Sequence, residues 1–540
     1  MSTDALATAL GYHQRTRHAP NAYARSLAYL DWDSQPDPFR RYSGAEVVLL
    51  DRAPGGADPR YDAVCDAALP APAALDWESL SRLFFDALAL SAWKEAGDTR
   101  WSLRVNPSSG NLHPTGAYLV CGPVPDIDAT PGVYHYNPFL HGLERRAALP
   151  AETWGRLAAD LPHGAVLVGL TSIVWREAWK YGERAFRYCQ HDVGHAIAAL
   201  SLAAGGLGWT VRLLESVPDG TMAELLGTAG TTGPEVEVPE CLLVVYPAQN
   251  PFPLPQWRHV RVPTLPTLTW VGTANRLSSD HHEWPVLEAV EVATRKLGAP
   301  GPTSWAPPPL RRERLADRPA TLRTIARQRR SAVEMDGRTR MGRDAFLRTL
   351  RRLLPGAPPF DPLPWAPAVH LGLFVHRVEG IAPGLYTFVR DPAALPALRA
   401  ALAPRFRWEE VEPGVPLYLL DPTDVRGLAG HVSCGQAIAG DGAFAVAMLA
   451  DVPGALAEHG AWFYRRLHWE AGAIGHALYL EAESDELRGT GIGCFFDDAT
   501  RQAFGIAAPS GWTPIYHFTV GGPVDDERLR TLDPYSHLPG

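Results

Sequence analysis

The chain has 540 residues, of which 46% are hydrophobic and 20% are charged, a composition typical of globular domains with sizeable cores. This length predicts two domains with additional segments. A formal net charge of −9 argues against a nucleic-acid partner, because phosphate binding requires a basic face. The six cysteines form no C-x-x-C pair, so neither a zinc ribbon nor a disulfide framework is indicated.

No apolar run is long enough to span a membrane, and the N-terminus lacks the order of segments found in signal peptides. Unpaired cysteines agree with a reducing compartment. We therefore expect a cytoplasmic protein with no membrane partner.

The first 72 residues are expected to form an N-terminal extension, because residues 20–72 are irregular and rich in Pro, Asp and Arg. The first regular helix is predicted to begin after Asp76, a candidate N-cap. Its apolar positions recur at helical spacing at Leu80, Leu83, Phe84, Ala87 and Leu88.

A short polar segment, residues 106–114, follows with apolar runs on both sides. Ser108, Ser109 and Asn111 offer hydroxyls and an amide, and Gly110 permits close approach of the backbone to a flat ligand. The segment, here called the serine loop, suits the polar rim of a ring system held by hydrogen bonds. It occurs once in the chain.

The two halves otherwise look like diverged copies. The run PGVYHY at residues 131–136 matches PGLYTF at 383–388, and residues 241–247 resemble 516–522. Between these matches, two long apolar helices begin with similar residues, namely Arg187, Asp192 and Gly194 in the first half and Arg465, Glu470 and Gly472 in the second. Three ordered matches predict two domains, not a solenoid of short repeats.

We expect the first domain at residues 73–297 and the second at 323–540, joined by a linker rich in Pro and Arg at 298–322. Each half shows strand, turn, strand, long helix and final strand, which predicts an α+β sandwich.

Two motifs are weighed and set aside. His191 and His195 stand at i and i+4, as in a metalloprotease helix, but Asp192 replaces the usual Glu and no third ligand is evident. A packed or hydrogen-bonded pair is expected, and no metal. The glycine-rich run at 489–493 is expected to form a loop, but it lacks the strand–loop–helix context of a dinucleotide site.

Arg329, Arg330 and Ser331 follow the linker. Guanidinium groups bind phosphate in a bidentate manner, and a serine hydroxyl adds a further bond. Several other arginines lie nearby, so a solvated basic patch is the alternative interpretation.

Taken together, residues 107–111, 329–331 and 489–493 resemble the flavin-binding set of the nitroreductase superfamily. The run 176–184 is similar to the Lys-Tyr motif of the SagB/ThcOx-type branch, which includes thiazoline/oxazoline dehydrogenases. Residues 12–18 resemble the N-terminal segment of that branch. The resemblance covers most of both halves.

The resemblance implies FMN held between two nitroreductase-like units. Those enzymes are usually homodimers, whereas here two α/β sandwiches are fused into an intrachain pseudo-dimer; further oligomerisation stays open. The implied cofactor site takes the serine loop from the first half. From the second half it takes Arg329, Arg330, Ser331, Gly491, Ile492, Gly493 and, as an additional charge, Arg528.

The mirror-related site is expected to be degenerate, with one FMN bound per chain. The second half has residues 364–370, including Trp365 and Pro367, where a serine loop should fall. The first half has no Arg-Arg-Ser before its Asp76 helix.

The resemblance makes Lys180 and Tyr181 the candidate catalytic pair, as a cation and a proton-transfer group. Burial or a neighbouring charge would have to tune either one as a base. Lys180 is one of three lysines in the chain. The alternative interpretation is that the two residues merely end a helix at Gly182.

The predicted function is an FMN-dependent oxidoreductase that dehydrogenates a heterocyclic or C–N-containing small molecule or peptide. One alternative is an NAD(P)H-dependent nitro, quinone or ene reductase. Another is a non-catalytic flavin-binding or scaffold protein that works with partner proteins of a biosynthetic complex.

Overall fold

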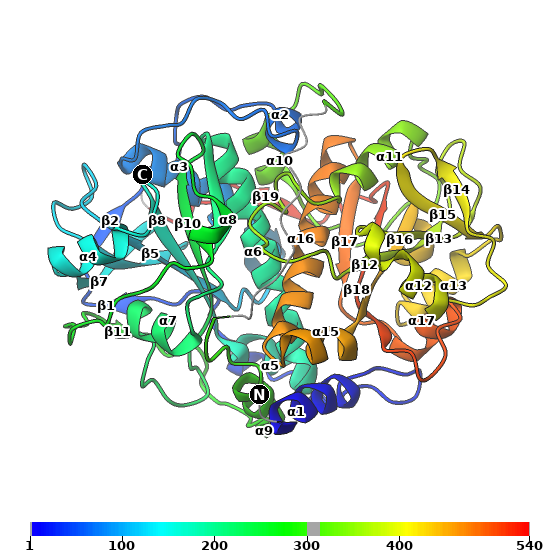
Figure 1. Cartoon of the computed structure of the whole chain (residues 1–540), viewed down its shortest axis with the longest axis horizontal. Coiled ribbons are helices and arrows are strands. Elements are labelled where there is room, and N and C mark those ends of the chain that lie inside the picture. Colours follow the sequence, from blue (N-terminus) through cyan, green and yellow to red (C-terminus); the bar gives the residue numbers. More distant parts are fainter. Residues whose placement is uncertain (1–2, 300–313, 539–540) are drawn as a thin grey trace.

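The computed structural model describes residues 3–299 and 314–538, and Figure 1 shows two halves, each with its own sheet, on either side of a pair of central helices. Most of the expected linker, residues 300–313, lies outside the described residues. Among the described residues, no helix combines the length and apolar character that crossing a membrane requires.

Each half contains a seven-stranded antiparallel sheet, and corresponding strands occupy corresponding positions in the two sheets. The first sheet has the order β2 (Val47–Leu49), β7 (Gly142–Ala148), β6 (Gly132–Asn137), β5 (Thr115–Cys121), β8 (Val166–Ser172), β10 (Val238–Pro247), β9 (Trp209–Leu213). The second has the order β14 (Glu409–Glu412), β15 (Val415–Asp421), β13 (Gly384–Phe388), β12 (His370–Val375), β16 (Phe444–Asp451), β18 (Trp512–Gly521), β17 (Arg488–Ile492).

This shared order confirms the sequence repeat. The matched runs at 131–136 and 383–388 become β6 and β13, and the matched runs near the domain ends become β10 and β18. The predicted α+β class, with two fused sandwiches, is also confirmed.

Both faces of each sheet are covered, so the central strands are buried throughout. In β8, Val166, Val168 and Leu170 face the inner core, whereas Leu167 faces an outer one, as the two-residue period of a strand requires. The inner core continues without a break from one half to the other. The outer cores are covered by short helices, namely α7 (Asp219–Leu226) in the first half and α13 (Arg426–Val432), α14 (Ile438–Asp441) and α17 (Asp497–Ala503) in the second.

The predicted helix after Asp76 is α3 (Trp77–Ala87), and its counterpart is α11 (Arg343–Arg352). Asp76 is the N-cap and accepts a hydrogen bond from Ser79 N in a capping box. Further helices outside the centre of the molecule are α4 (Ala151–Ala158), α5 (Val174–Tyr181), α8 (Leu254–Trp257), α9 (Pro285–Ala293), α12 (Leu395–Ala401) and α15 (Val452–His459).

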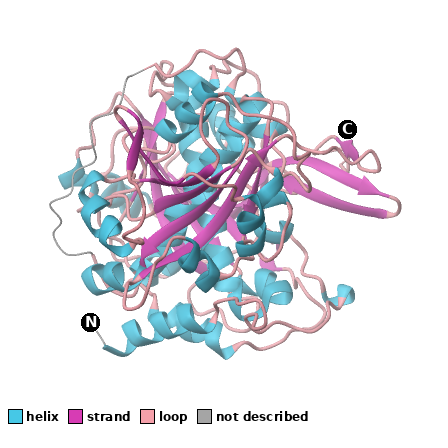
Figure 2. Ribbon diagram, turned by 90° about the vertical axis from the view of Figure 1, so that its right-hand side faces the viewer, coloured by secondary structure: helices cyan, strands magenta, loops and turns pink. Residues whose placement is uncertain are grey.

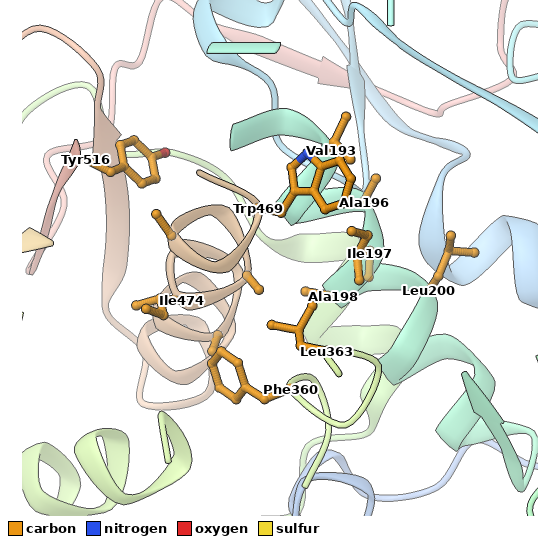
Figure 3. Packing of buried hydrophobic residues seen from close by; sticks show 14 of the residues in the cluster. Val193, Ala196, Ile197, Ala198, Leu200, Phe360, Leu363, Trp469, Ile474 and Tyr516 are labelled. Carbon is orange, nitrogen blue, oxygen red and sulfur yellow. The ribbon is translucent and has the colours of Figure 1, made fainter. Parts of the chain in front are cut away.

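The centre of the molecule is the crossing of α6 (Ala185–Gly206) and α16 (Phe463–Ser484), which are almost entirely buried. A Cβ on Gly194 would lie 2.1 Å from the carbonyl oxygen of Trp469, and one on Gly472 would lie 2.1 Å from that of His191. Each contact repeats the other with the two halves exchanged, as in an isologous dimer interface. Figure 3 shows the Trp469 side chain beside Val193 and Ala196 of α6.

Several segments cross from one half to the other. The hairpin of β3 (Leu90–Ala96) and β4 (Thr99–Arg104) pairs with β19 (Arg530–Leu532) near the C-terminus. Figure 2 shows these strands projecting from the body beside the C-terminus. Near the N-terminus, α1 (Thr3–Arg15) packs on α9 of the first half and on α15 of the second.

The region expected as an N-terminal extension also contributes to the first sheet. It contains the edge strand β2 and the strand β1 (Tyr42–Ser43), which pairs with β11 (Thr273–Ala274). Its helix α2 (Tyr61–Cys65) packs on α10 (Leu322–Gln328). The helix α10 leads into residues 329–331, here called the arginine segment. The expected boundary at residue 72 therefore falls within one continuous structure.

Candidate functional site

A cavity of about 710 Å³ lies where the two halves meet. This volume falls within the roughly 300–1,000 Å³ of small-molecule sites. The first half contributes the serine loop, and the second contributes residues 329–333 and 488–494. The fold thus brings the serine loop to two segments of the second half that lie more than two hundred residues further along the chain.

Asp192 of α6 anchors the serine loop through hydrogen bonds. Ser109 donates to Asp192 Oδ1 from its backbone N at 3.0 Å and from its Oγ at 3.1 Å. Burial raises the pKa of Asp192 to about 7, although hydrogen bonds from Ser108 and Ser109 oppose the shift. In the sequence, Asp192 stands out as a repeat position and as the residue beside His191, not as a site residue; in the structure it anchors the loop.

The polar groups of the loop are largely used within it. Asn111 Nδ2 donates to Ser102 O at 2.9 Å, its Oδ1 lies 2.9 Å from His113 Nε2, and Ser108 Oγ accepts from His113 N at 2.8 Å. A ligand would therefore meet the loop backbone and the remaining lone pairs of the hydroxyls. By contrast, the buried Asn106 Oδ1 has no hydrogen-bond partner among the described residues, and Asn106 lines the cavity.

Gly110 lines the cavity and also has a structural role that the sequence did not reveal. Its φ of +57° is left-handed, and a Cβ there would lie 2.5 Å from the hydroxyl oxygen of Tyr181. The glycine is required because Tyr181 packs directly on the loop, whether or not a ligand is bound.

The opposite wall consists of the arginine segment and β17. The glycine-rich run expected as a loop is a strand, paired with β18. Its glycines make room for aromatic rings: a Cβ on Gly491 would lie 2.0 Å from Tyr516 Oη, and one on Gly493 would lie 2.2 Å from the Tyr188 ring. Ile492, which stands between the two glycines in the sequence, is buried and also lines the cavity.

A shared tyrosine joins the arginine segment to β17. Tyr479 Oη lies 2.8 Å from Ser331 Oγ and accepts a hydrogen bond from Gly491 N at 2.9 Å. Ala332 N also donates to Gly489 O at 3.1 Å. Ser331 and Gly491, predicted from separate motifs, are thereby fixed side by side.

Cations gather at this wall. Arg330, Arg488 and Lys94 all line the cavity. Arg330 donates to the carbonyl oxygens of Arg327 and Arg329 at 2.8 and 2.7 Å, and within the described part of the chain no carboxylate forms an ion pair with it. Arg329 is buried and donates to the backbone of the first half, at Val105 O and Arg104 O.

Burial, together with Arg329 and Arg488, lowers the pKa of Arg330 to about 10. The pKa of Lys94 is also lowered, first by burial and then by Arg330 and Arg488. Arg488 has a carboxylate partner, Glu483, with Nε to Oε2 at 3.2 Å. The cations therefore repel one another, and an anion in the cavity would relieve this repulsion.

Two of the predicted site residues do not line the cavity. Arg528 is 87% exposed and pairs with Asp526 Oδ2 at 2.7 Å. Lys180 is half-buried, and its Nζ lies 5.4 Å from the centre of the Tyr181 ring. The geometry thus gives no support to a direct phosphate contact by Arg528.

Tyr181 does line the cavity, at the end of α5, with its ring 4.6 Å from that of Tyr188. Burial, followed by Glu177 and Tyr188, raises the pKa of Tyr181 well above its usual value. This environment keeps the phenol protonated, so it can donate a hydrogen bond and is not tuned as a base.

Several cavity residues were not predicted as site residues, notably Lys94, Trp101, Tyr188, Tyr479, Arg488, Cys494 and Tyr516. Lys94 had a usable signal, since lysine is rare in this chain. The others reach the cavity through tertiary packing, which no local pattern announces.

The mirror-related position is organised around Glu470, the counterpart of Asp192. Glu470 Oε2 accepts from Trp365 Nε1 and Ala368 N, both at 3.1 Å, so the segment at 364–370 does replace the serine loop. Arg466 stacks on Trp365 at 5.3 Å. Lys296 Nζ donates at 2.8 Å to the backbone oxygen of Glu215, just after β9, the counterpart of β17.

The paired histidines of α6 are packed, as predicted, and His195 is also hydrogen-bonded, whereas neither ring nitrogen of His191 has a hydrogen-bond partner among the described residues. His191 stacks on Tyr516 at 4.2 Å, and His195 Nε2 lies 3.2 Å from Tyr516 Oη. Among the described residues, no group of three or more His, Cys, Asp or Glu side chains is arranged to hold a metal ion.

No profile of a known protein family matches the chain. The trifolitoxin-processing protein TfxB from Rhizobium leguminosarum bv. trifolii is 31% identical over 154 residues. That match covers 27% of this chain and 39% of the length of TfxB.

Among solved structures, a candidate nitroreductase from Anabaena variabilis matches with a TM-score of 0.67 at 22% identity, covering 96% of this chain and 99% of that one. A chain of the E. coli microcin synthetase McbBCD complex with truncated pro-MccB17 bound, and a candidate nitroreductase from Ralstonia eutropha, match at a TM-score of 0.27 with 17% and 15% identity. They cover 46% and 42% of this chain and 94% and 97% of their own chains. A TM-score of 0.27 does not establish a common fold. The first match extends through both halves, so the chain has a nitroreductase fold built from two fused units.

Proposed function

We propose that the chain is an FMN-dependent oxidoreductase that dehydrogenates a heterocyclic or C–N-containing small molecule or peptide. The observation that carries the proposal is the composition of the cavity. Arg330, which forms no ion pair within the described part of the chain, and Arg488 lie on the wall from the second half, and Lys94 of the first half lies with them. The serine loop, with the orphaned amide oxygen of Asn106, lies on the opposite wall.

FMN fits these two walls chemically. Its phosphate would relieve the repulsion among Arg330, Arg488 and Lys94, and Ser331 would add a hydrogen bond. Its polar ring edge would lie against the serine loop and offer Asn106 Oδ1 a donor. When bound, FMN supplies the hydride-transfer chemistry, and the protein supplies position and electrostatics.

Tyr181 is the proposed proton donor at the cavity, because its phenol stays neutral and faces the serine loop. Lys180 is proposed to act through Tyr181, since its charge lies over the face of that ring. The catalytic pair suggested by the Lys-Tyr motif is therefore retained with unequal roles.

The substrate class is proposed from the similarity to TfxB. TfxB is named for the processing of trifolitoxin, and this favours a role in processing a product of a biosynthetic system, with partner proteins of that system. The name of the Anabaena variabilis protein favours the second candidate, a reductase that uses a nicotinamide donor. Bleaching of the bound flavin by NADPH or NADH in the absence of substrate would favour this second candidate function, the nicotinamide-dependent reductase.

A matched pair of arginine variants tests the cofactor assignment. Apoprotein carrying Arg330→Ala should bind FMN roughly 10- to 150-fold more weakly than wild type, the equivalent of one lost charge-assisted hydrogen bond. Arg528→Ala, the control, should bind normally. With riboflavin, which lacks the phosphate, the Arg330→Ala defect should disappear.

Fluorescence titration gives all of these affinities. Equal binding of FMN by wild type and Arg330→Ala, or release of FAD from the purified protein, would contradict the assignment.

A further inference from the structure

Two of the six cysteines lie side by side at the edge of the cavity. Cys494 follows β17 and lines the cavity, and its thiol is in hydrogen-bonding contact with that of Cys434. Both residues are partly exposed, whereas Cys65, Cys121, Cys189 and Cys241 are buried.

Hydrogen bonds to the backbone hold together the two segments that carry these cysteines. Phe496 N donates to Val432 O at 2.8 Å. The Gln436 side-chain amide donates to both Ser433 O and Cys494 O, at 2.8 and 3.1 Å. These bonds bind the turn between α13 and α14 to the chain that leaves β17.

That turn has an unusual backbone. Cys434 adopts a left-handed φ of +57°, a conformation that is strained for a residue with a side chain, and Gly435 follows at +73°. The strained conformation places the Cys434 thiol against Cys494. Non-glycine residues in this region cluster at functional sites.

A histidine completes the pair. His18 Nδ1 accepts a hydrogen bond from Ala24 N at 2.9 Å, so a neutral ring carries its proton on Nε2. Burial lowers the pKa of His18 and favours that neutral ring. Nε2–H is thus the donor available for the hydrogen bond to Cys494.

These contacts favour the thiolate at one sulfur only. The Cys434 thiol and then His18 lower the pKa of Cys494 to about 5, with Arg184 adding a favourable charge. The hydrogen bond to Cys494 raises the pKa of Cys434. An accessible thiolate beside a protonated thiol is the arrangement of an attacking and a resolving cysteine.

We propose that Cys434 and Cys494 are a redox-active dithiol in the cavity wall, which a low-molecular-weight disulfide oxidises to an intrachain disulfide. The Cys494 thiolate attacks one sulfur of the small disulfide and releases one equivalent of thiol, leaving a mixed disulfide on Cys494. Cys434 then attacks the Cys494 sulfur, loses its proton and releases the second equivalent of thiol. The protein is oxidised by two electrons, and the small disulfide is reduced to two thiols.

Oxidation would change the cavity without dismantling it. It would remove the thiolate charge next to Gly493 and tie the α13–α14 turn covalently to the end of β17. The site belongs to the protein whether or not the cavity holds a flavin, so the inference does not depend on the proposed function.

The test uses glutathione disulfide as the probe and the purified full-length chain. After incubation, free thiols are blocked with N-ethylmaleimide, and intact mass and peptide mapping are recorded. We expect four of the six thiols to remain, with a cross-linked peptide containing Cys434 and Cys494 that dithiothreitol releases.

Two variants separate the roles. Cys434→Ser should stop at a single glutathione adduct on Cys494, and Cys494→Ser should leave Cys434 unmodified. Cys65→Ala, which removes a buried thiol in α2, should still form the cross-link. The wild-type peptide map decides the matter even if a variant fails to fold. Six free thiols, a persistent wild-type glutathione adduct, or a disulfide between other cysteines would overturn the proposal.

Discussion

Tyr181 stands where three features of the site meet: it ends α5, packs on Gly110 of the serine loop and faces the cavity. Its raised pKa keeps the proton on the phenol, so a substrate or reaction intermediate would receive a hydrogen bond or a proton from it. Positioned proton transfer of this kind contributes on the order of 10²–10⁴-fold to a rate.

Tyr181→Phe should therefore lose turnover by roughly 10²–10⁴-fold while retaining bound FMN, because the ring still packs on Gly110. Tyr29→Phe, at an exposed tyrosine, is the control and should behave as wild type. Steady-state rates together with flavin absorbance separate the two effects. Normal turnover in Tyr181→Phe, or inactivity explained by flavin loss alone, would remove Tyr181 from the mechanism.

Asp192 provides a prediction about pH. Its pKa is about 7 in the folded chain, because it is buried, and about 3.9 when unfolded. Between these values the folded state binds the additional proton, so the Asp192 contribution to the free energy of unfolding falls as pH rises from about 4 to about 7. Above pH 7 the loss is complete, and below pH 4 it is absent.

The melting temperature of wild type minus that of Asp192→Asn should accordingly decrease from about pH 4 to about pH 7 and then level off. Asp98→Asn, in an exposed turn, controls for the change in net charge and should give a flat difference. A difference for Asp192→Asn that is flat, or that increases with pH, would show that the carboxyl is not held in its neutral form.

At the scale of elements, α6 and α16 meet through two glycines. Gly194→Ala should lower the melting temperature, because the new methyl group would lie 2.1 Å from the Trp469 carbonyl oxygen and overpacking typically costs about 1–3 kcal/mol. Gly155→Ala, in α4, has open space at the Cβ and should raise stability by up to about 1 kcal/mol. Calorimetry compares the two. Equal melting temperatures would mean that the helix crossing tolerates a wider separation.

The elements were more predictable than their contacts. The α3 helix followed from a capping residue and helical spacing, and the repeat followed from residue matches that became corresponding strands. The sequence predicts a loop at 489–493, but residues 489–492 belong to β17, because their backbone pairs with β18, and Gly493 follows the strand. The glycines leave room for the rings of Tyr516 and Tyr188, which are tertiary contacts that the local sequence does not reveal.

The site was predictable where one short segment carries the chemistry. The serine loop and the arginine segment could be identified, and the structure places them on opposite walls of the cavity. Trp101 could not be assigned, because its hairpin reaches the cavity beside a C-terminal strand far away in sequence; for Lys94 of the same hairpin, the rarity of lysine is the one signal. Arg528 has the right charge and neighbourhood, but its side chain turns to Asp526 in the exposed turn.

At the scale of the whole molecule, the chain has two-fold symmetry in its fold and asymmetry in its sites. Strand order and the helix crossing repeat, whereas the serine loop and the cation cluster each occur on one side of a single cavity. At the mirror position, Trp365 and Arg466 stack together, and Glu470 binds the loop that replaces the serine loop. The central claim is therefore one cofactor site built from both halves.

Counting flavin per chain tests this claim most directly. Apoprotein of known concentration is titrated with FMN, and the end point is read from flavin fluorescence or calorimetry. The structure leads us to expect saturation at one FMN per chain, since the mirror position lacks both the serine loop and the Arg-Arg-Ser segment. Saturation at two FMN per chain would contradict the account, as would saturation at one half, which would require two chains to build each site.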